Sequence, residues 1–214
     1  MTRVYIIRHC EAQGNKDGKF QGRVDSGISE NGIAQLKKLE ERFKNIHIDA
    51  IYSSPLKRAI FTADAVNKYH GLEIKLENDL REIDGGEFEG NFWKDLPVLF
   101  PDRANLWVNE PYRFATQSGE SMKDVYTRVT NALINIAKKQ ENRTIAIVTH
   151  GCSIRNILSF IKYGSLDMIN EVKWCDNTSV SLVEFDADLK PTLIFENDTS
   201  HLNKDLLEFS CKFI

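Results

Sequence analysis

Short apolar runs alternate with stretches of helical periodicity along most of the chain. The runs 4–7 and 144–149 have the length and the β-branched composition of buried strands. Two stretches, 30–44 and 121–140, carry apolar residues at spacings of three and four, which predicts helices that pack one face on a sheet. Strands that alternate with helices predict an α/β fold, in which a mainly parallel sheet has helices on both faces.

Caps, turn residues and short apolar runs predict the remaining elements. Ser29 is the expected N-cap of the helix over 30–44. Ser53, Ser54 and Pro55 are expected to begin a further helix, because serine caps helices and proline suits the first helical position. The inward faces of the two long helices are expected to be Ile33, Leu36, Leu39 and Phe43, and Val125, Val129, Leu133 and Ile136. We also expect strands over 46–52, 72–80, 180–185 and 192–195, the last two as an antiparallel pair, and a helix over 153–162 that Gly164 ends.

The stretch 86–119 breaks this pattern and is rich in proline, tryptophan, phenylalanine and arginine. Long irregular segments in compact domains are usually lids or binding loops. We therefore expect a single domain over 1–214 with a small inserted cap over roughly 86–119; a packed helical excursion without a ligand role is the alternative. Trp93, Phe100 and Trp107 either line the pocket or pack at the contact of a homodimer, and Arg23, Arg103 and Arg113 are candidates to bind a second anionic group.

Charge and composition narrow the class of protein. The net charge of -3 and the pI near 6.0 give no reason to expect nucleic acid or a membrane surface as partner. No apolar stretch has the length of a membrane span, and the N-terminus runs into a strand without a signal-peptide core, so we expect a cytoplasmic protein. The four cysteines, Cys10, Cys152, Cys175 and Cys211, lack the spacing of a disulfide framework and are expected to be reduced thiols.

Two histidines follow two of the predicted strands directly. His9 comes after the run 4–7 with Arg8 before it, and His150 ends the run 144–149. Because ligands bind at the carboxyl ends of the strands in open parallel sheets, we expect both imidazoles to lie in one site. The guanidinium of Arg8 suits phosphate or carboxylate oxygens, so this pairing indicates phosphoryl chemistry.

Four motifs in order extend this pattern: Arg8-His9, the segment 53–59, the segment 80–90 and Thr149-His150-Gly151. In these motifs the chain resembles the histidine phosphatase superfamily, also called phosphoglycerate mutase-like, from residue 4 to about residue 183, with a looser match between Gly90 and Gly119. The resemblance implies that fold and a metal-independent phosphomonoesterase that needs no cofactor. It further implies a phosphohistidine intermediate and a small phosphorylated metabolite as substrate.

The same resemblance implies a role for each matching residue. His9 is the nucleophile, which Arg8, Arg58 and His150 surround with donors to the phosphate. Glu82 is the general acid and then the base, with Asp84 as its competitor for that role. The remaining implied phosphate contacts are Asn15, Gln21 and Gly22 in the loop after the nucleophile, and Gly151 and Cys152 at the start of the helix after His150.

The chain departs from the family pattern at Cys10, where glycine or alanine is usual, and Cys152 lies close to His150 in sequence. We favour two small apolar fillers. Reversible oxidation of the thiols is an alternative. A zinc site of His9, Cys10, His150 and Cys152 has suitable ligand types, but adjacent residues on extended chain point to opposite sides. A non-catalytic phospho-ligand binder is disfavoured because both histidines and Glu82 are retained.

The choice between a phosphatase and a mutase depends on the segment that follows Glu82, the implied general acid. A mutase holds a substrate with two anionic positions and excludes water, so mutases of the family carry more basic residues and a longer cap. The segment 82–90 resembles the phosphatase branch. We therefore favour hydrolysis and keep phosphoglycerate mutase as the alternative.

Overall fold

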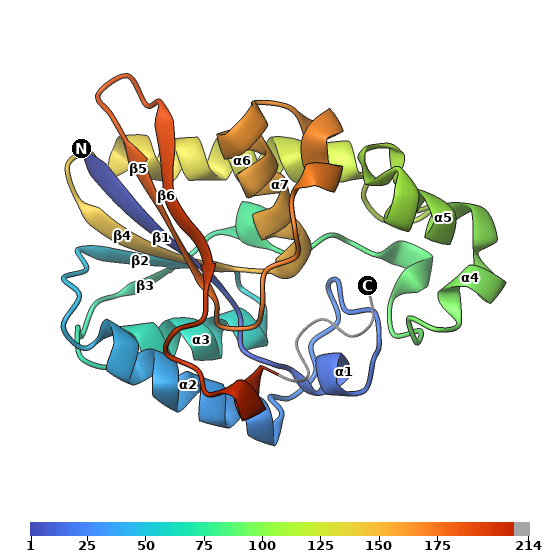
Figure 1. Ribbon diagram of the computed structural model, residues 1–214, viewed down its shortest axis with the longest axis horizontal. Helices are drawn as coiled ribbons and strands as arrows, with labels where there is room; N and C mark the ends of the chain where they lie inside the picture. Colours follow the sequence, from blue (N-terminus) through green and yellow to red (C-terminus); the bar gives the residue numbers. More distant parts are fainter. Residues whose placement is uncertain (208–214) are drawn as a thin grey trace.

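A six-stranded sheet forms the centre of the protein (Figure 1). The computed structural model describes residues 1–207. Along the sheet the order is β3-β2-β4-β1-β5-β6; the first four strands are parallel, and β5 and β6 are antiparallel to their neighbours. This arrangement confirms the mainly parallel α/β fold. The strands are β1 (Thr2–Arg8), β2 (Ala50–Ser53), β3 (Ile74–Leu76), β4 (Thr144–Thr149), β5 (Val180–Phe185) and β6 (Pro191–Asp198).

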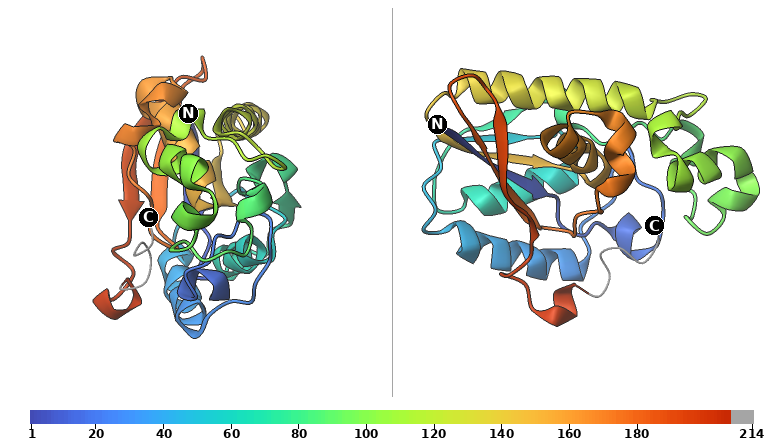
Figure 2. Two further views of the ribbon diagram at one scale, coloured as in Figure 1. Left: turned by 90° about the vertical axis from the view of Figure 1, so that its right-hand side faces the viewer. Right: turned by 45° about the horizontal axis from the view of Figure 1, so that its top comes forward.

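Helices cover both faces of this sheet, with α6 (Met122–Lys139) and α7 (Gly151–Tyr163) on one and α2 (Glu30–Phe43) and α3 (Lys57–Asn67) on the other (Figures 1 and 2). The two faces follow from the alternation of side chains along a strand. In β1, Val4 and Ile6 pack in the core of α6 and α7, whereas Ile7 packs in the core of α2 and α3. Both faces of the central strands are therefore buried, which explains why their sequences are apolar runs rather than alternating patterns.

Helix α2 confirms the predicted cap and corrects the predicted inward face. The hydroxyl of Ser29 accepts from the amide of Gly32 at 2.9 Å. Ile33 is 50% exposed, although the spacing placed it in the core. Gln35 is buried instead, because its side chain accepts from the amide of Glu11 at 2.9 Å and donates to a main-chain carbonyl of the C-terminal segment.

Helix α3 begins at Lys57, later than the serine and proline signals predicted. Its first amide, that of Lys57, donates to the two carboxylate oxygens of Asp25 at 3.0 and 3.2 Å. The cap thus comes from a loop far away in sequence, and neither Ser53 nor Ser54 serves as the N-cap. Ser54 has another contact, described with the site below.

Helix α6 agrees with its prediction in bounds and inward face, and it begins with a cap that was not predicted. Ser121 and Asp124 form a reciprocal capping box, with bonds of 3.2 and 3.0 Å between the side chain of each and the amide of the other. All four residues of the predicted inward face are buried. Among the described residues, no helix is both long enough and apolar enough to span a membrane.

Several other bounds differ from the predictions by a few residues. Strand β3 is shorter than the predicted strand, because a 3₁₀ turn, η1 (Asn78–Leu80), replaces its last residues. Helix α7 begins two residues early, at Gly151, and ends as predicted at Gly164, which has a φ of 67°. The remaining short elements are α1 (Gln13–Lys16), η4 (Leu166–Glu171) and η5 (Lys204–Leu206).

Residues 86–119, here called the cap segment, lie beyond the end of the sheet toward which β1 and β4 run (Figure 1). The segment is helical rather than irregular. Its aromatic side chains pack on one another and on the main core, with Trp107 only 4% exposed. The short helices are η2 (Gly86–Phe88), α4 (Leu96–Leu99), α5 (Pro101–Asn109) and η3 (Pro111–Arg113).

Candidate active site

The parallel pairing of β1 with β4 brings the two predicted histidines together. Arg8 is the register partner of Thr149, so His9 and His150 follow at the same edge of the sheet. The amide of His9 donates to the carbonyl of Thr149 at 2.9 Å, and the two imidazole centroids lie 5.1 Å apart. One site therefore contains both rings, at the strand ends where α/β sheets bind ligands.

The His9 ring is fixed in one tautomer. Its Nδ1 lies 2.6 Å from the carbonyl oxygen of Cys10, and because a carbonyl only accepts, Nδ1 carries the hydrogen. Burial, followed by the charges of Arg58 and Arg8, lowers the pKa of His9 well below its usual value. The ring is therefore neutral at pH 7, and its Nε2 carries a free electron pair.

The His150 ring is buried at the N-cap position of α7. Its Nε2 lies 2.7 Å from Oγ of Ser54. Its Nδ1 is buried and forms no hydrogen bond within residues 1–207. Burial and then the charge of Arg58 lower the pKa of His150, so this ring is neutral as well.

Arg58 extends from the first turn of α3 into the site and is 1% exposed. Its Nη2 donates to the carbonyl of Gly22 at 2.7 Å and its Nη1 to that of Val24 at 3.0 Å, while Nε has no partner among the described residues. Burial lowers the pKa of Arg58, and the carboxylates of Glu82 and Asp25 oppose that effect. A carboxylate oxygen of Asp25 lies 3.7 Å from Nη1, beyond hydrogen-bond distance, so the planar guanidinium can still bind an anion through Nε.

Arg8 approaches the same place from the end of β1. Its Nη1 donates to the carbonyl of Cys175. A Cβ on Gly151 would lie 3.3 Å from Nε of Arg8 and 3.4 Å from the ring of Trp174. Gly151 thus lies between the guanidinium and an aromatic wall, at the position where α7 begins.

The loop after His9 bonds extensively within itself. Oδ1 of Asn15 accepts from the amide of Ala12 at 3.1 Å, which leaves its amino group as a donor. The side-chain amide of Gln21 contacts Oγ of Ser26 at 2.8 Å, and with its amino group on that oxygen it also accepts from the amides of Gly14 and Asn15. Gln21 therefore shapes the loop that carries Asn15.

Gly22 is required where it lies, in contact with the segment that carries Glu82. Its amide donates to Glu89 at 3.1 Å, and its carbonyl accepts from Arg58. A Cβ at this position would overlap with the carbonyl oxygen of Ile83 and the carboxylate of Glu89. The residue thus orients Arg58, and its amide is already engaged within the protein.

The Glu82 carboxylate binds the first turn of α7. One oxygen accepts from the amide of Cys152 at 2.9 Å and the other from the amide of Ser153 at 3.1 Å. The positive end of a helix dipole stabilises such a carboxylate. Cys152 therefore donates to Glu82, whereas we expected its amide to face the phosphate. Asp84 instead caps its own turn, where it accepts from the amide of Gly86 at 3.1 Å.

The two thiols near the histidines are buried and face different surroundings. Sγ of Cys10 lies 4.0 Å from the carbonyl of Arg58, and burial raises the pKa of Cys10 to about 11. Sγ of Cys152 lies 3.5 Å from Sδ of Met122, and burial also raises the pKa of Cys152. These positions agree with apolar fillers, and across residues 1–207 no three metal-ligating side chains gather to hold an ion. Cys211 lies outside the described residues.

The three arginines considered for a second anion are already paired with carboxylates. Arg103 binds Glu87 at 3.1 Å and Arg113 binds Glu110 at 2.7 Å. Arg23 binds Glu120 at 3.1 Å. The positive charge of each is therefore partly neutralised within the protein.

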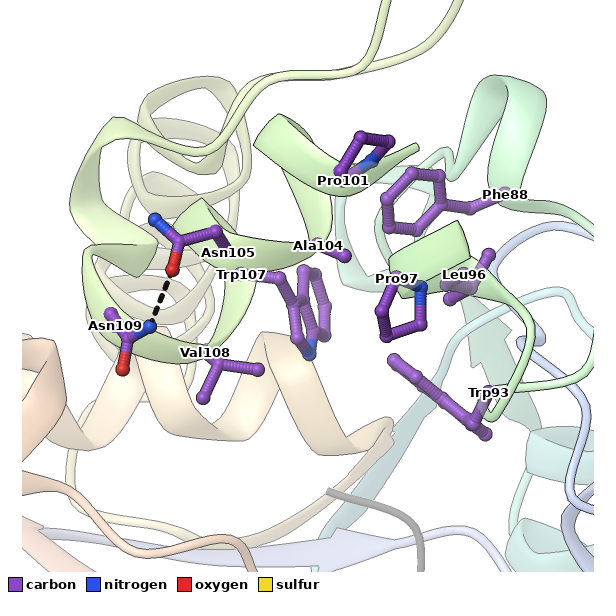
Figure 3. Close-up of a pocket in the computed structure, with 10 residues that line it drawn as sticks. All are labelled: Phe88, Trp93, Leu96, Pro97, Pro101, Ala104, Asn105, Trp107, Val108 and Asn109. Atoms are coloured by element: carbon purple, nitrogen blue, oxygen red, sulfur yellow. Dashed lines mark hydrogen bonds between the residues drawn. The ribbon is translucent and has the colours of Figure 1, made fainter. Parts of the chain in front are cut away.

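The cap segment contains a cavity of about 380 Å³ between α4 and α5 (Figure 3). Trp93 and Trp107 form part of its lining, and Trp107 also stacks on Trp174 with centroids 5.8 Å apart. Because Trp174 flanks Gly151, aromatic contacts connect the cap segment to the edge of the candidate site. Trp93 and Trp107 therefore pack within their own chain.

Sequence reasoning missed three residues that shape this site. Ser54 was interpreted as a helix cap and instead contacts His150. Arg128 lies on α6, and its guanidinium donates to the carbonyl of Glu82 at 3.0 Å, a contact that no local pattern signals. Trp174 lies in a loop without periodicity, where an isolated tryptophan near the last strands was the only signal.

Comparisons with known proteins give a consistent result. A family model described as "Histidine phosphatase superfamily (branch 1)" matches residues 4–199. Phosphoserine phosphatase 1 of Hydrogenobacter thermophilus is 32% identical over 212 residues, 97% of this chain and 98% of that protein. Bacillus stearothermophilus YhfR has a TM-score of 0.89 at 30% identity and covers 94% of this chain and 99% of its own. A histidine-to-alanine variant of a phosphoserine phosphatase from Entamoeba histolytica, in complex with phosphoserine, has a TM-score of 0.82 at 29% identity, over 95% and 100% of the two chains.

Proposed function

The chain belongs to the histidine phosphatase superfamily, branch 1, and from this membership we propose that it hydrolyses small phosphomonoesters, with phosphoserine as the first candidate substrate. The enzyme class follows from relatives that match nearly the whole chain and are named phosphoserine phosphatases. The observation that carries the mechanism is the tautomer of His9. A neutral ring with Nδ1 bonded to Cys10 offers Nε2 as a nucleophile.

In the proposed first step, Nε2 of His9 attacks the phosphorus as the bond from phosphorus to the ester oxygen breaks. The protonated carboxyl of Glu82 gives its proton to the departing oxygen. In the second step, Glu82 removes a proton from water, the water oxygen binds phosphorus, and the bond between phosphorus and nitrogen breaks. Inorganic phosphate and the original ring and carboxyl are restored.

We propose that side chains and amides of the protein stabilise the negative charge of the transferring phosphoryl group. Arg8 and Arg58 supply guanidinium donors, and His150 supplies Nδ1, the ring nitrogen that lacks a partner within the described residues. The amino group of Asn15 and the helix start at Gly151 complete the donors to the phosphate. Such a set provides the electrostatic stabilisation that phosphoryl transfer requires without a metal ion.

The remaining loop residues act on these donors rather than on the phosphate. We assign Gln21 to the shape of the loop, Gly22 to the orientation of Arg58, and the amide of Cys152 to Glu82. Each assignment follows from a hydrogen bond that the group already makes.

The cap segment is proposed to close a single histidine phosphatase domain and to select the organic part of the substrate. Its short helices lie beyond the strand ends (Figure 1), and Trp107 contacts Trp174 beside Gly151. Because Arg23, Arg103 and Arg113 are each paired with a carboxylate, the feature that favoured a mutase is weakened, and hydrolysis is the better supported activity. We propose the cytoplasm as its location, since the buried thiols of Cys10 and Cys152 suit a reducing compartment.

The test is phosphate release from a panel of phosphomonoesters in the presence of EDTA, with conversion of 3-phosphoglycerate to 2-phosphoglycerate measured in parallel. Wild type should hydrolyse phosphoserine with chelator present, and His9→Ala should lose at least about 10³-fold in kcat/KM, the scale of removing a nucleophile. His47→Ala is the matched control, because its side chain is 79% exposed and, within residues 1–207, bonds only to Asp49. Undiminished activity of His9→Ala would overturn the proposed nucleophile, and isomerisation faster than phosphate release would establish the mutase instead.

A further inference from the structure

The segment that carries Glu82 is held from behind by a side chain of α6. Arg128 donates from Nη1 to the carbonyls of Asp79 at 2.8 Å and Arg81 at 2.6 Å. Its Nη2 donates to the carbonyl of Glu82 itself at 3.0 Å. Three carbonyls within four residues thus converge on one guanidinium, which fixes the path of the main chain where Glu82 leaves it.

Glu120, which directly precedes the N-cap of α6, holds Arg128 in place. Its carboxylate accepts from Nε and Nη2 of Arg128 at 2.8 and 2.9 Å, a two-pronged pair, and from the amide of Asp84 at 2.9 Å. Burial acts to raise the pKa of Glu120, but the hydrogen bonds and charge of Arg128 outweigh it, and the pKa is lowered. Glu120 is therefore a carboxylate at neutral pH.

Arg23 closes the network from the other side. Its Nε donates to the carbonyl of Glu82 at 3.0 Å, and its Nη2 lies 3.1 Å from Glu120. The carbonyl of Glu82 thus receives two guanidinium donors, and the same carboxylate balances both charges. Two-pronged guanidinium contacts restrict geometry more than a single charge does.

The main chain and the side chain of Glu82 are therefore fixed by different elements. The network of Glu120, Arg128 and Arg23 holds the main chain, whereas the amides of Cys152 and Ser153 at the start of α7 hold the carboxylate. Since His150 is the N-cap of this helix, two residues before Cys152, the carboxylate is tied to the proposed phosphate-binding histidine. The network therefore sets the position of the Glu82 main chain relative to its carboxylate.

We propose that Glu120 and Arg128 are positioning residues for proton transfer by Glu82 to the departing oxygen. This inference rests on the proposed role of Glu82 as general acid. A displacement of about 1 Å at a catalytic group is enough to cost about 10²-fold in rate, so a change in this buried pair acts on catalysis without contact to substrate.

Two substrates that differ only in the leaving group can distinguish a displaced Glu82 from a general loss of structure. Phenyl phosphate needs a proton on the departing oxygen, whereas 2,4-dinitrophenyl phosphate departs without one. We compare kcat/KM, which includes only steps up to the first irreversible one. A displaced Glu82 lowers the value for phenyl phosphate alone, but a distorted pocket lowers both.

Arg128→Lys and Glu120→Gln are the test variants, with Glu82→Gln as reference. Arg42→Lys is the matched control, because the Arg42 side chain is 12% exposed against 13% for Arg128 and also bonds a carboxylate and a carbonyl, both from Asp198. We expect each test variant to lose about 30-fold on phenyl phosphate and less than about 3-fold on 2,4-dinitrophenyl phosphate. Arg42→Lys should change neither value, and thermal unfolding should show that all variants are folded at the assay temperature.

Equal losses on both substrates in Arg128→Lys and Glu120→Gln, with the expected dependence in Glu82→Gln, would overturn the positioning role and leave the proposed function intact. Equal losses in Glu82→Gln itself would overturn its role as acid and the positioning role with it. If Glu120→Gln is unfolded, Arg128→Lys alone decides, because lysine keeps the charge while it loses the planar donor set.

Discussion

Oγ of Ser54 lies 2.7 Å from Nε2 of His150. The contact uses one ring nitrogen and leaves Nδ1 for a ligand. We expect Ser54→Ala to lower kcat/KM about 10-fold, because the ring loses the partner that fixes its orientation. Steady-state hydrolysis measures the loss. Ser53→Ala is the control, since the Ser53 hydroxyl bonds only to the carbonyl of Ser54 among the described residues and is also buried; equal activities of the two variants would contradict the prediction.

Gly22 and Gly27 lie in the same loop but differ in the space around them. A Cβ on Gly22 would overlap with Ile83 and Glu89, whereas a Cβ on Gly27 meets no atom within 4 Å. Gly22→Ala should therefore lower the free energy of unfolding by about 2 kcal/mol, the usual scale of overpacking, and should reduce activity as Arg58 loses its carbonyl partner. Urea unfolding and kcat/KM measure both effects. Gly27→Ala should match wild type, and a stable, active Gly22→Ala would show that the loop moves freely.

The buried thiols should resist modification in the folded protein. Because burial raises the pKa of Cys10 to about 11, only about one molecule in 10³ carries the thiolate at pH 8. Iodoacetamide or peroxide at pH 8 should leave Cys10 and Cys152 unmodified by mass spectrometry and leave activity unchanged, whereas both should react in urea. Reversible inactivation with oxidised Cys10 would instead support redox control.

His201 should make the fold less stable in mild acid. Burial and then the charge of Arg42 lower its pKa from 6.5 to about 4, and Nη1 of Arg42 lies 3.0 Å from its Nδ1. Between these values the unfolded chain binds a proton that the folded chain does not, so stability falls as pH drops from 6.5 toward 4. After allowance for partial exposure this amounts to about 1–2 kcal/mol.

The measurement for His201 is urea unfolding of wild type and His201→Gln between pH 8 and pH 4.5. Glutamine offers an acceptor to Arg42 but binds no proton, so the decline with falling pH should be smaller in the variant. Near pH 8 His201 is neutral in both the folded and the unfolded chain, so the difference in stability between the two proteins should be constant there. Parallel declines would refute the assignment.

Some features could be read from the sequence because their signals are local. Both histidines follow apolar runs directly, and parallel strands that pair must deliver them to one edge. The inward face of α6 was predicted for the same reason, since its apolar residues recur at spacings of three and four.

Other features depend on residues that are distant in sequence. Asp25 caps α3 from 32 positions away, and Gln35 is buried on account of Glu11 and the C-terminal segment. No periodicity encodes such contacts, because they exist only after the sheet has brought the loops together.

The pairing of β1 with β4 also determines the stage of folding at which the protein becomes active. His9 follows the first strand and His150 follows a strand more than a hundred residues later, with the cap segment between them. A fragment that ends in the cap segment contains one ring of the pair, and a fragment that starts there contains the other. Turnover therefore requires the two halves of the chain to be assembled in register, so phosphate release during refolding reports the completion of the sheet's centre.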